Sequence, residues 1–515
     1  MKNEAANITI PKTEYESLKA ENAELSQKVN WFMEQLRLSR QRRFGQSSEK
    51  SAYNQINLFN EPETVADTSV TEPVIEEVKS YRRKKSGNTP DRLPPDLPTE
   101  TVEHELAEPD RQCPECNGSL HVMGRETREE LKLVPAKALI IRHVRHVYAC
   151  RNCEKNAENV PILKAPLPAP VIKGSFASPE SVAYIASQKF VMGIPLYRQE
   201  QEWERSGISL SRQTMCNWLI KSTDSWLKPI YDRLHELLCA GAVAHADETT
   251  LQVLNEPGKS AQSKSYMWLY RTGCDAKRQI VLYDYQPSRS GKHPAEFLEG
   301  YKGYLHTDGY AAYHSGLPEQ ITVVGCWAHC RRKFDEALNA IAEKDRKNSN
   351  ALKGKRYCDR LFEIERDLSG LPPDDDFKAR CEARIERLKP VMDEFFEWAS
   401  NLVSLPKTII GQAIRYAIDQ KPWLERVLSD GRLELSNNRA ERSIKPFVIG
   451  RKNWLFNNTP QGATTSAIIY SLIETAKENG VNPYAYLCFV FRTAPNLNEG
   501  SSIDSLLPWN MCGVV

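Results

Sequence analysis

The sequence lacks any apolar run of about 18 residues, the length that a membrane-spanning helix requires. Its first twenty or so residues also lack the apolar stretch of a signal peptide. We therefore expect a cytoplasmic protein with no membrane partner. Net charge is nearly absent too, because 69 Lys and Arg oppose 67 Asp and Glu, which leaves +2. Any nucleic-acid surface must then be built from local clusters of basic residues.

The rest of the composition is that of an ordinary folded protein. Apolar residues make up 40% and charged residues 26%, which excludes a wholly disordered, collagen-like or purely coiled-coil chain. At about 100–200 residues per domain, 515 residues predict a multidomain protein. The 13 cysteines are odd in number, and the two tightest pairs are CxxC, which favours reduced thiols and metal binding over a disulfide framework.

Residues 10–50 carry the pattern of a leucine-zipper-like coiled coil with a basic end. Apolar residues recur in sevens in two registers, with Asn22 at a position that selects a parallel pair; they are Leu18, Leu25 and Phe32, and Tyr15, Val29 and Leu36. This pattern predicts a homo-oligomer, at least a dimer, although a single helix packed on its own domain would show it as well. Arg42 and Arg43 follow as candidate phosphate contacts, with a solvated basic face as the alternative.

Residues 51–100 pass from acidic to basic to proline-rich without any period, which predicts a disordered linker. In the next segment, 101–165, two CxxC pairs form a four-thiolate set that is suited to one tetrahedral Zn²⁺. The four residues are Cys113, Cys116, Cys150 and Cys153. The spacer between the pairs is longer than in compact zinc ribbons, so four unrelated buried cysteines are the alternative.

Residues 175–235 predict helices joined by short turns. Gly207 ends one helix, and Ser209 or Ser211 caps the next, which opens on Arg212. A helix, a glycine-containing turn and a helix with a polar start form a helix-turn-helix-like arrangement, whose second helix can enter a major groove. Tight helical packing without a role in DNA binding explains the pattern equally well.

The chain as a whole is predicted to be a multidomain α/β protein, and residues 240–465 are predicted to be its catalytic domain. The pattern there is three hairpin-like strands, a helix, a strand and a helix, which is the order of an RNase H-like domain. Asp247 lies on the first strand and Asp308 at the end of the fourth. A charged helical insertion covers about 335–430, after which Glu441 lies in the first turns of a helix. Residues 466–515 are expected to form a C-terminal helical segment.

Three carboxylates from distant parts of a chain repel one another unless cations neutralise them, so their convergence predicts hard divalent ions. Two Mg²⁺ ions would activate the attacking oxygen and stabilise the leaving oxygen of a phosphoryl displacement. The catalytic and magnesium-binding residues predicted in this way are Asp247, Asp308 and Glu441, with Glu434 as the nearest substitute for the third. Each of these acids taken alone is more often a solvated or capping residue.

Five motifs carry a resemblance to a known family: ADET, HTDGYAAY, CWAHCRRKF, NNRAERSIKPFVIGRKNWLF and YSLIETAKENGVNPYAYL. They resemble those of the IS66 family of insertion-sequence transposases over nearly the whole chain. The resemblance implies an RNase H-like fold with a DDE triad on Asp247, Asp308 and Glu441, the residues that the strand pattern also selects. It implies DNA transposition and recombination, with double-stranded transposon ends and target as partners and accessory proteins beside them. Cys330 departs from the pattern, where a small residue is expected.

Basic residues around the triad are predicted to contact DNA phosphates, with solvated helix faces as the alternative. They are His329, Arg331, Arg332, Arg439, Arg442, Lys445, Arg451 and Lys452. A second metal site at Cys326, His329 and Cys330 is conceivable, but core packing is the favoured interpretation. Trp454 beside Leu455 and Phe456 is likewise favoured as core over base stacking.

Two rival functions remain open at this stage. One is a dimeric, zinc-containing DNA-binding regulator whose RNase H-like domain is inactive. The other is an RNase H-like nuclease that does not transpose. The intact carboxylate motifs count against the first, and the zipper, zinc segment and insertion together count against the second.

Overall fold

The computed structural model describes residues 162–368, 377–498 and 500–511, with residues 101 and 137–150 and scattered residues between 11 and 29. The chain divides into two compact units, Ser47–Lys164 and the combination of Met1–Gln46 with Ala165–Val515. Of the heptad residues of the predicted zipper, Asn22 and Val29 are among the described residues, where both are helical and exposed, whereas the basic end and the linker lie outside the described part of the chain.

The described part of the smaller unit is an antiparallel pair of short strands. Strand β1 (Val147–Ala149) pairs with β2 (Ile162–Lys164), with Tyr148 opposite Leu163. Cys150 follows β1 directly and is exposed, whereas the other three predicted zinc ligands lie outside the described residues.

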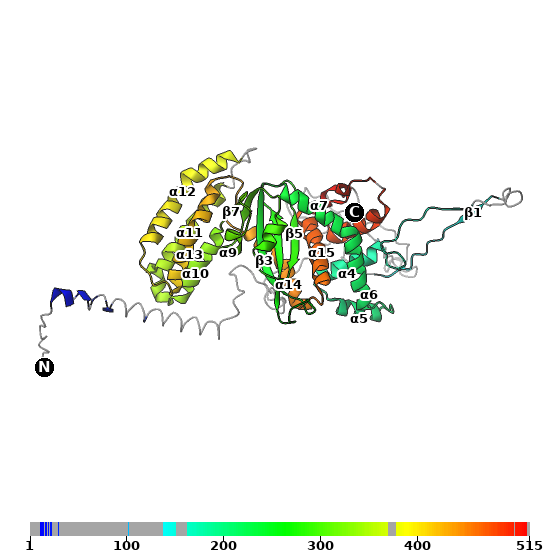
Figure 1. Cartoon of the computed structure of the whole chain (residues 1–515), viewed down its shortest axis with the longest axis horizontal. Helices are drawn as coiled ribbons and strands as arrows, with labels where there is room; N and C mark the ends of the chain where they lie inside the picture. Colours follow the sequence, from blue (N-terminus) through cyan, green and yellow to red (C-terminus); the bar gives the residue numbers. More distant parts are fainter. Residues whose placement is uncertain are drawn as a thin grey trace, which may run out of the picture. The chain divides into compact units, whose positions relative to one another are not determined.

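The larger unit is built on a five-stranded sheet in the order β5-β4-β3-β6-β7. Strands β3, β4 and β5 form an antiparallel meander, and β6 and β7 run parallel to β3, which lies at the centre (Figure 1). This is the strand order expected for the RNase H-like domain. The strands are β3 (Val243–Gln252), β4 (Lys264–Thr272), β5 (Val281–Gln286), β6 (Gly303–His306) and β7 (Ile321–Val324).

Three helices connect or follow the later strands of the sheet. Helix α8 (Lys292–Phe297) leads from β5 to β6, α9 (Ala311–Ser315) from β6 to β7, and α10 (Trp327–Ala340) continues from β7. Helix α14 (Asn438–Trp454) returns from the insertion and packs against β3 and β4. The helix that carries Glu441 is thereby placed on the strand that carries Asp247.

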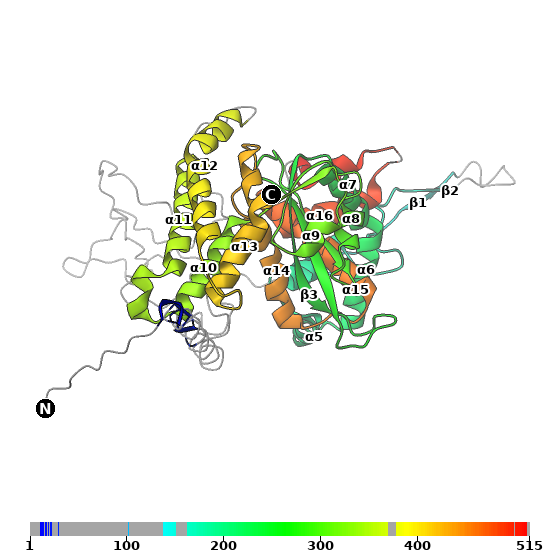
Figure 2. The ribbon, with the colours of Figure 1, turned by 60° about the vertical axis from the view of Figure 1, so that its left-hand side comes forward.

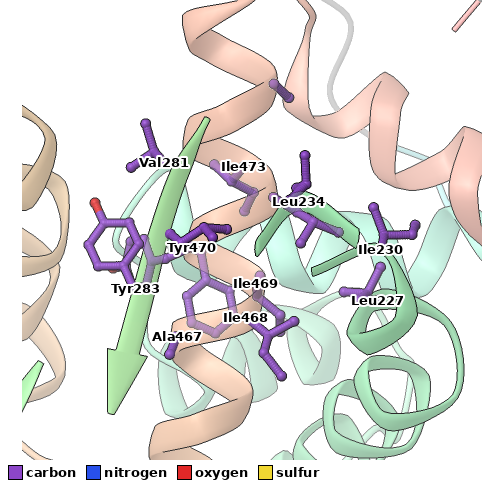
Figure 3. Close-up of a cluster of buried hydrophobic side chains, with 14 of the residues drawn as sticks. Leu227, Ile230, Leu234, Val281, Tyr283, Ala467, Ile468, Ile469, Tyr470 and Ile473 are labelled. Carbon is purple, nitrogen blue, oxygen red and sulfur yellow. The ribbon is translucent and has the colours of Figure 1, made fainter. Parts of the chain in front are cut away.

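Strand β5 is at one edge of the sheet, and helix α15 (Pro460–Glu478) covers that edge with side-chain hydroxyls as well as apolar contacts. The amide of Val281 donates to Thr475 Oγ1 at 3.0 Å, and the amide of Tyr283 donates to Ser471 Oγ at 2.7 Å. These two hydroxyls are four residues apart and therefore lie on one face of the helix. They accept hydrogen bonds from the β5 amides that have no strand partner, which prevents another strand from pairing with this edge. Figure 3 shows the apolar side chains that fill the space between β5, α15 and the helices beyond.

The segment 166–240 folds into the expected helices, which pack against α15 and the C-terminal helix α16 (Pro483–Thr493). Ser211 rather than Ser209 caps α6 by accepting a hydrogen bond from the Thr214 amide, and Gly207 ends α5 with a φ of 76°. These elements are α4 (Pro179–Phe190), α5 (Leu196–Arg205), α6 (Arg212–Ser222), a π-helical turn (Thr223–Leu227) and α7 (Lys228–Cys239).

The helical insertion consists of α11 (Asn350–Leu368), α12 (Lys378–Asn401) and α13 (Ile409–Leu424), with the 3-10 turns Glu343–Asn348 and Glu425–Leu428. These helices pack together with α10 (Figure 2), and α13 contacts β7 at the edge of the sheet, which Figure 1 labels. Their aromatic core is separate from the main core and surrounds Phe395. The predicted start of the insertion, at about residue 335, falls inside α10, whose buried residues Trp327, Cys330 and Phe334 belong to this core.

Short 3-10 turns complete the C-terminal segment at Ala494–Asn496, Ile503–Leu506 and Pro508–Asn510. The predicted boundary between 465 and 466 falls inside α15, whose buried face belongs to the main core. None of the helices in the described part of the chain has the length and apolar character needed to cross a membrane.

Candidate active site

Three acidic side chains come from the three elements that the sequence predicted. Asp247 lies on β3, Asp308 follows β6 by two residues, and Glu441 is in the first turn of α14. Strands β3 and β6 are parallel neighbours in which His245 stands opposite His306. Asp247 and Asp308 each lie two residues beyond this pair, so both follow the same direction out of the sheet.

The three carboxylates influence one another electrostatically. Burial raises the pKa of Asp247 well above its usual range, and the neighbouring charges of Glu248, Asp308 and Glu441 act in the same direction. The amide of Glu248 opposes them by donating a hydrogen bond of 2.8 Å to Asp247 Oδ1. The Tyr310 amide donates to Asp308 Oδ1 at 2.9 Å and fixes the turn after β6. The sheet thus holds a buried acid among other acids.

Glu248 is a fourth acid that the sequence analysis did not single out, although it stands in the ADET motif. Its side chain is only 3% exposed, and burial followed by the charge of Asp308 raises its pKa. Tyr313 donates to it at 2.7 Å, and Arg289 pairs with it from the far end of β5. The guanidinium of Arg289 also lies 3.6 Å from the centre of the Tyr310 ring.

Glu441 has basic partners on α10. Arg332 Nη2 lies 3.0 Å from one carboxylate oxygen of Glu441, and His329 Nε2 lies 3.6 Å from the other. Burial lowers the pKa of His329, while the charges of Glu441 and Asp308 act to raise it. The CWAHCRRKF motif therefore brings its histidine and second arginine next to the third carboxylate.

A buried polar network lies beneath the carboxylates and has one member on each of their elements. His245 and His306 stack with their rings 4.7 Å apart, and His245 Nδ1 lies 3.0 Å from the side-chain oxygen of Asn437. Asn437 donates from its side chain to the Ala246 carbonyl at 2.8 Å, and its own carbonyl accepts from the Glu441 amide at 3.2 Å. The start of α14 is thereby fastened to β3, next to Asp247.

Glu434, the predicted substitute for the third carboxylate, belongs to this network instead. Its carboxylate lies 3.0 Å from His245 Nε2 and 2.8 Å from Arg439 Nε. Burial acts to raise its pKa, but the hydrogen bonds from His245 and Arg439 outweigh burial and lower it. Glu248 is the better placed alternative, since it adjoins Asp247 and interacts with Asp308.

No group of three or more His, Cys, Asp or Glu side chains in the described residues is arranged closely enough to enclose a metal ion. In this structure Arg332 pairs with Glu441, the carboxylate that a metal ion would have to share with Asp247 and Asp308. The donor set is nonetheless entirely of carboxylate oxygens, the ligands that Mg²⁺ prefers. The burial of Asp247 among acids is also the kind of unbalanced charge that a cation relieves.

Comparison with known proteins identifies the family of this chain. Residues 174–465 match the family described as "Transposase IS66 family", which is more than half of the chain. The chain belongs to the IS66 transposase family. Residues 110–154 match its zinc-finger binding domain, 471–509 the IS66 C-terminal element, and 31–102 its leucine-zipper segment, described as "Transposase C of IS166 homeodomain".

Curated relatives cover most of the chain. The uncharacterized protein y4jD of Sinorhizobium fredii is 33% identical over 436 residues, which is 81% of each chain. The uncharacterized protein y4qI of the same organism is 32% identical over 460 residues, 85% of this chain and 81% of that protein. Membership of the IS66 family implies a DDE domain and DNA transposition.

The basic residues that the sequence selected in this IS66 chain fall into two groups. Arg331 and Arg439 pair with Asp359 and Glu434, so their charges are engaged within the fold. Arg451 is half-buried and donates to the hydroxyls of Thr249 and Thr250 on β3. The other described ones lie on open surfaces or beside the carboxylates: Arg212, His329, Arg332, Arg442, Lys445 and Lys452. Arg42 and Arg43 lie outside the described residues. Arg442, Lys445 and Lys452 are exposed and follow one face of α14, because they are spaced at about one and two helical turns.

The alternative metal site on α10 is not formed. Cys326 and Cys330 are buried in the core, and Cys330 lies against Cys358 of α11 in the insertion. The departure from the family pattern at Cys330 is therefore accommodated by packing. Trp454 is half-buried and packs against Phe447 with ring centres 5.5 Å apart, as its core interpretation predicted.

Proposed function

We propose that this IS66 family chain binds the ends of an insertion sequence in the cytoplasm and catalyses strand cleavage and strand transfer. The observation that carries the proposal is the position of Asp247 on β3, where partial burial and the charges of Glu248, Asp308 and Glu441 raise its pKa. An acid held in this way without a nearby cation destabilises the fold, which is expected where a ligand supplies the missing charge. The proposed catalytic residues are Asp247, Asp308 and Glu441.

Two Mg²⁺ ions held by these carboxylates would activate the attacking oxygen and stabilise the leaving oxygen of the phosphoryl displacement. The chain's own residues do the rest. The network of His245, His306 and Asn437 keeps the three elements in register. Arg332 neutralises Glu441 before metal binds and is then in place to contact a phosphate, with His329 beside it.

The exposed basic face of α14 extends this phosphate-binding surface away from the carboxylates. Glu441 is the single acid on that helix, whereas Arg442, Lys445 and Lys452 line its exposed side. Arg212 opens α6, the second helix of the helix-turn-helix-like pair, and its side chain is 64% exposed. We propose that these residues hold duplex DNA through its phosphates.

The decisive experiment compares cleavage with binding in charge-neutral variants. Asp247→Asn, Asp308→Asn and Glu441→Gln should each lower cleavage of labelled transposon-end DNA in Mg²⁺ by about a thousandfold or more. Gel shifts at fixed salt should show unchanged or slightly tighter binding, because a negative charge near phosphate has been removed. Glu336→Gln, an exposed acid on α10, is the matched control and should keep full cleavage.

A metal readout that needs no cleavage accompanies this assay. Mg²⁺ should raise the melting temperature of the wild-type protein but not of the Asp247→Asn protein. Full cleavage by Glu441→Gln would show that the third carboxylate is misassigned, with Glu248 next to be tested. A wild-type protein that binds ends but never cuts, even with accessory proteins, would favour the inactive regulator.

We further propose that Cys113, Cys116, Cys150 and Cys153 hold one structural Zn²⁺. The match of residues 110–154 to the family's zinc-finger domain spans all four cysteines. Metal analysis of the purified protein should find one zinc per chain, and Cys113→Ser should lose it. Zinc retained in full by that variant would contradict the assignment.

Self-association through the heptad pattern of residues 10–50 completes the proposal, since the family's leucine-zipper segment overlaps it from residue 31. Deletion of residues 1–50 should lower the oligomeric state in sedimentation experiments. An unchanged oligomer would show that another surface holds the copies together.

A further inference from the structure

Helix α14 ends in a strained turn. Leu455 has φ 66° and ψ −51°, and the Phe456 amide donates to the Trp454 carbonyl at 2.8 Å, which closes a three-residue turn. A non-glycine residue in this conformation is strained, and it persists only where the surroundings enforce it.

The surroundings enforce this turn from both sides. Before it, Trp454 packs its ring against Phe447 in the main core. After it, the buried Asn457 pairs with Val253 beyond the end of β3, and its amide donates to the Gln252 carbonyl at 3.0 Å. Leu455 and Phe456 lie between Trp454 and Asn457, and the contacts of those two residues fix the backbone on both sides of the turn.

The side chains held in this way point to solvent although both are large and apolar. Leu455 is 64% exposed and Phe456 is 43% exposed, so burial in the fold does not offset the strain. Their nearest charged neighbour along the chain is the exposed Lys452, on the basic face of α14. Gly193 in the turn between α4 and α5 lies against Asn453, since a Cβ there would stand 2.6 Å from its side-chain nitrogen.

We propose that Leu455 and Phe456 form an apolar wedge that enters between base pairs of the duplex bound along α14. The inference rests on the proposed function, because it requires DNA on that helix. Basic residues draw the phosphates to the helix, and an apolar tip at its end then meets the stacked bases, where it can part a base step. The turn's strain fits this role, since a wedge must keep its shape while it displaces stacked bases.

The helix also sets where the wedge would act. Leu455 lies 14 residues beyond Glu441 on one helix. At 1.5 Å per residue the separation is about 21 Å, which corresponds to about six base pairs of B-form DNA. For a duplex that runs parallel to α14, the parted base step would therefore lie about six pairs from the phosphate that is cut.

The test needs no knowledge of the end sequence. Binding is measured at fixed salt to a 30-base-pair duplex, fully paired or with a central two-base mismatch that carries 2-aminopurine next to it. Because a mismatch is already partly unstacked, the wild-type protein should bind it about tenfold more tightly and raise the probe's fluorescence. Leu455→Ser with Phe456→Ser should lose the preference and keep the affinity for paired DNA.

Two single variants distinguish insertion of a wedge from non-specific hydrophobic binding to DNA. Ile449→Ser removes an apolar residue, 46% exposed, from the regular part of α14 and should keep the preference. Leu455→Gly should lose the preference while raising the melting temperature, because glycine adopts positive φ without strain. Equal binding of both duplexes by the wild-type protein, or a preference that survives in the double variant, overturns the wedge alone. Failure to bind either duplex overturns the proposed function as well.

Discussion

Acidic residues have opposite surroundings in the five-stranded sheet and in the helical insertion. On β3 and β5, burial raises the pKa values of Asp247, Glu248 and Asp284. In the insertion, burial acts in the same direction on Asp359, but hydrogen bonds from Arg331 and Lys355 outweigh it and lower the pKa. Asp359 in the insertion, whose side chain is 33% exposed, has cations as partners, whereas Asp247 on the sheet has other acids as its charged neighbours.

The same contrast holds for the insertion's most deeply buried charge. Arg384 is fully buried, and its donors reach Glu365 and the carbonyls of Val427, Asp430 and Leu433. In the sheet, neither ring nitrogen of the buried His306 has a hydrogen-bond partner within the described residues. The difference indicates that the insertion is arranged for stability, while the sheet's end gives up stability where a ligand is to bind.

The largest expected effect tests the insertion as a stabilising element. Phe395 is fully buried and faces Trp327, Phe334 and Phe396, so Phe395→Ala should lower the free energy of unfolding by about 3–5 kcal/mol. The exposed Glu397 on the same helix is the control, since Glu397→Ala should change it by less than about 0.5 kcal/mol. Urea unfolding measures both, and a loss below about 1 kcal/mol for Phe395→Ala would show that this core relaxes around the cavity.

The second prediction concerns the network beneath the carboxylates. Asn437→Ala should cost about 1–3 kcal/mol of stability, because it leaves the His245 ring and the Ala246 carbonyl on β3 without their side-chain partner. Thr475→Val is the matched control, since it removes buried hydrogen bonds of 3.0 Å to Val281 far from the carboxylates. Only Asn437→Ala should also lower cleavage and the affinity for Mg²⁺, the latter measured by thermal shift. Equal cleavage by both variants would make Asn437 purely structural.

The third prediction uses the pH dependence of stability to test the opposite pKa shifts of the acids in the sheet and in the insertion. Burial raises the pKa of Asp284 from 3.8 to about 6, against a hydrogen bond from Gln286. Folded protein then binds the proton more tightly than unfolded protein, so wild-type stability falls as pH rises between these values. Asp284→Asn should match wild type near pH 4 and exceed it by about 1–3 kcal/mol above pH 6.

Asp359 supplies the control of opposite sign. Its lowered pKa means that its ionised form stabilises the fold, and this contribution is lost as pH falls through the folded pKa. Asp359→Asn should therefore be less stable than wild type at neutral pH, and the difference should shrink below about pH 4. Unfolding curves for both variants that shift in the same direction with pH would contradict the contrast between the two regions.

Patterns within a short stretch of sequence predicted what local structure and strand order decide. A β-rich run interrupted by an acid predicted Asp247 on the first strand, and the turn at Gly309 predicted Asp308 at the end of the fourth; the structure makes these two strands parallel neighbours. Ser211 was one of two expected caps. The pairing of His245 with Asn437 was beyond reach, because the two residues are 192 positions apart and nothing local distinguishes a buried network from a solvated one. Arg439 had the pattern of a DNA contact for the same reason, although the fold pairs it with Glu434.

Segment boundaries were the least predictable feature. Residues 460–478 form one continuous helix because its hydroxyls and apolar face close the edge of β5, a requirement set by a strand almost 200 residues earlier. Glu248 was missed because one acid next to another on a strand normally points to the opposite face. Tyr313 and Arg289 hold Glu248 by a hydrogen bond and an ion pair, contacts that the strand's own sequence does not reveal.

The smallest expected effect on stability comes from Arg332, where the two regions meet. Its ion pair with Glu441 joins side chains that are 51% and 25% exposed, so Arg332→Gln should change the free energy of unfolding by less than about 1 kcal/mol. The effect on the affinity for Mg²⁺ should be larger, because in this variant Glu441 can bind the metal ion without first breaking its ion pair with Arg332. Mg²⁺ should then reach half its thermal stabilisation of the protein at a lower concentration than in wild type. Arg331→Gln is the matched control one residue earlier, since Arg331 pairs with Asp359 in the insertion and should leave the Mg²⁺ dependence unchanged. Equal shifts in the two variants would mean that only net charge matters, and no shift in either would show that Arg332 does not compete with the metal.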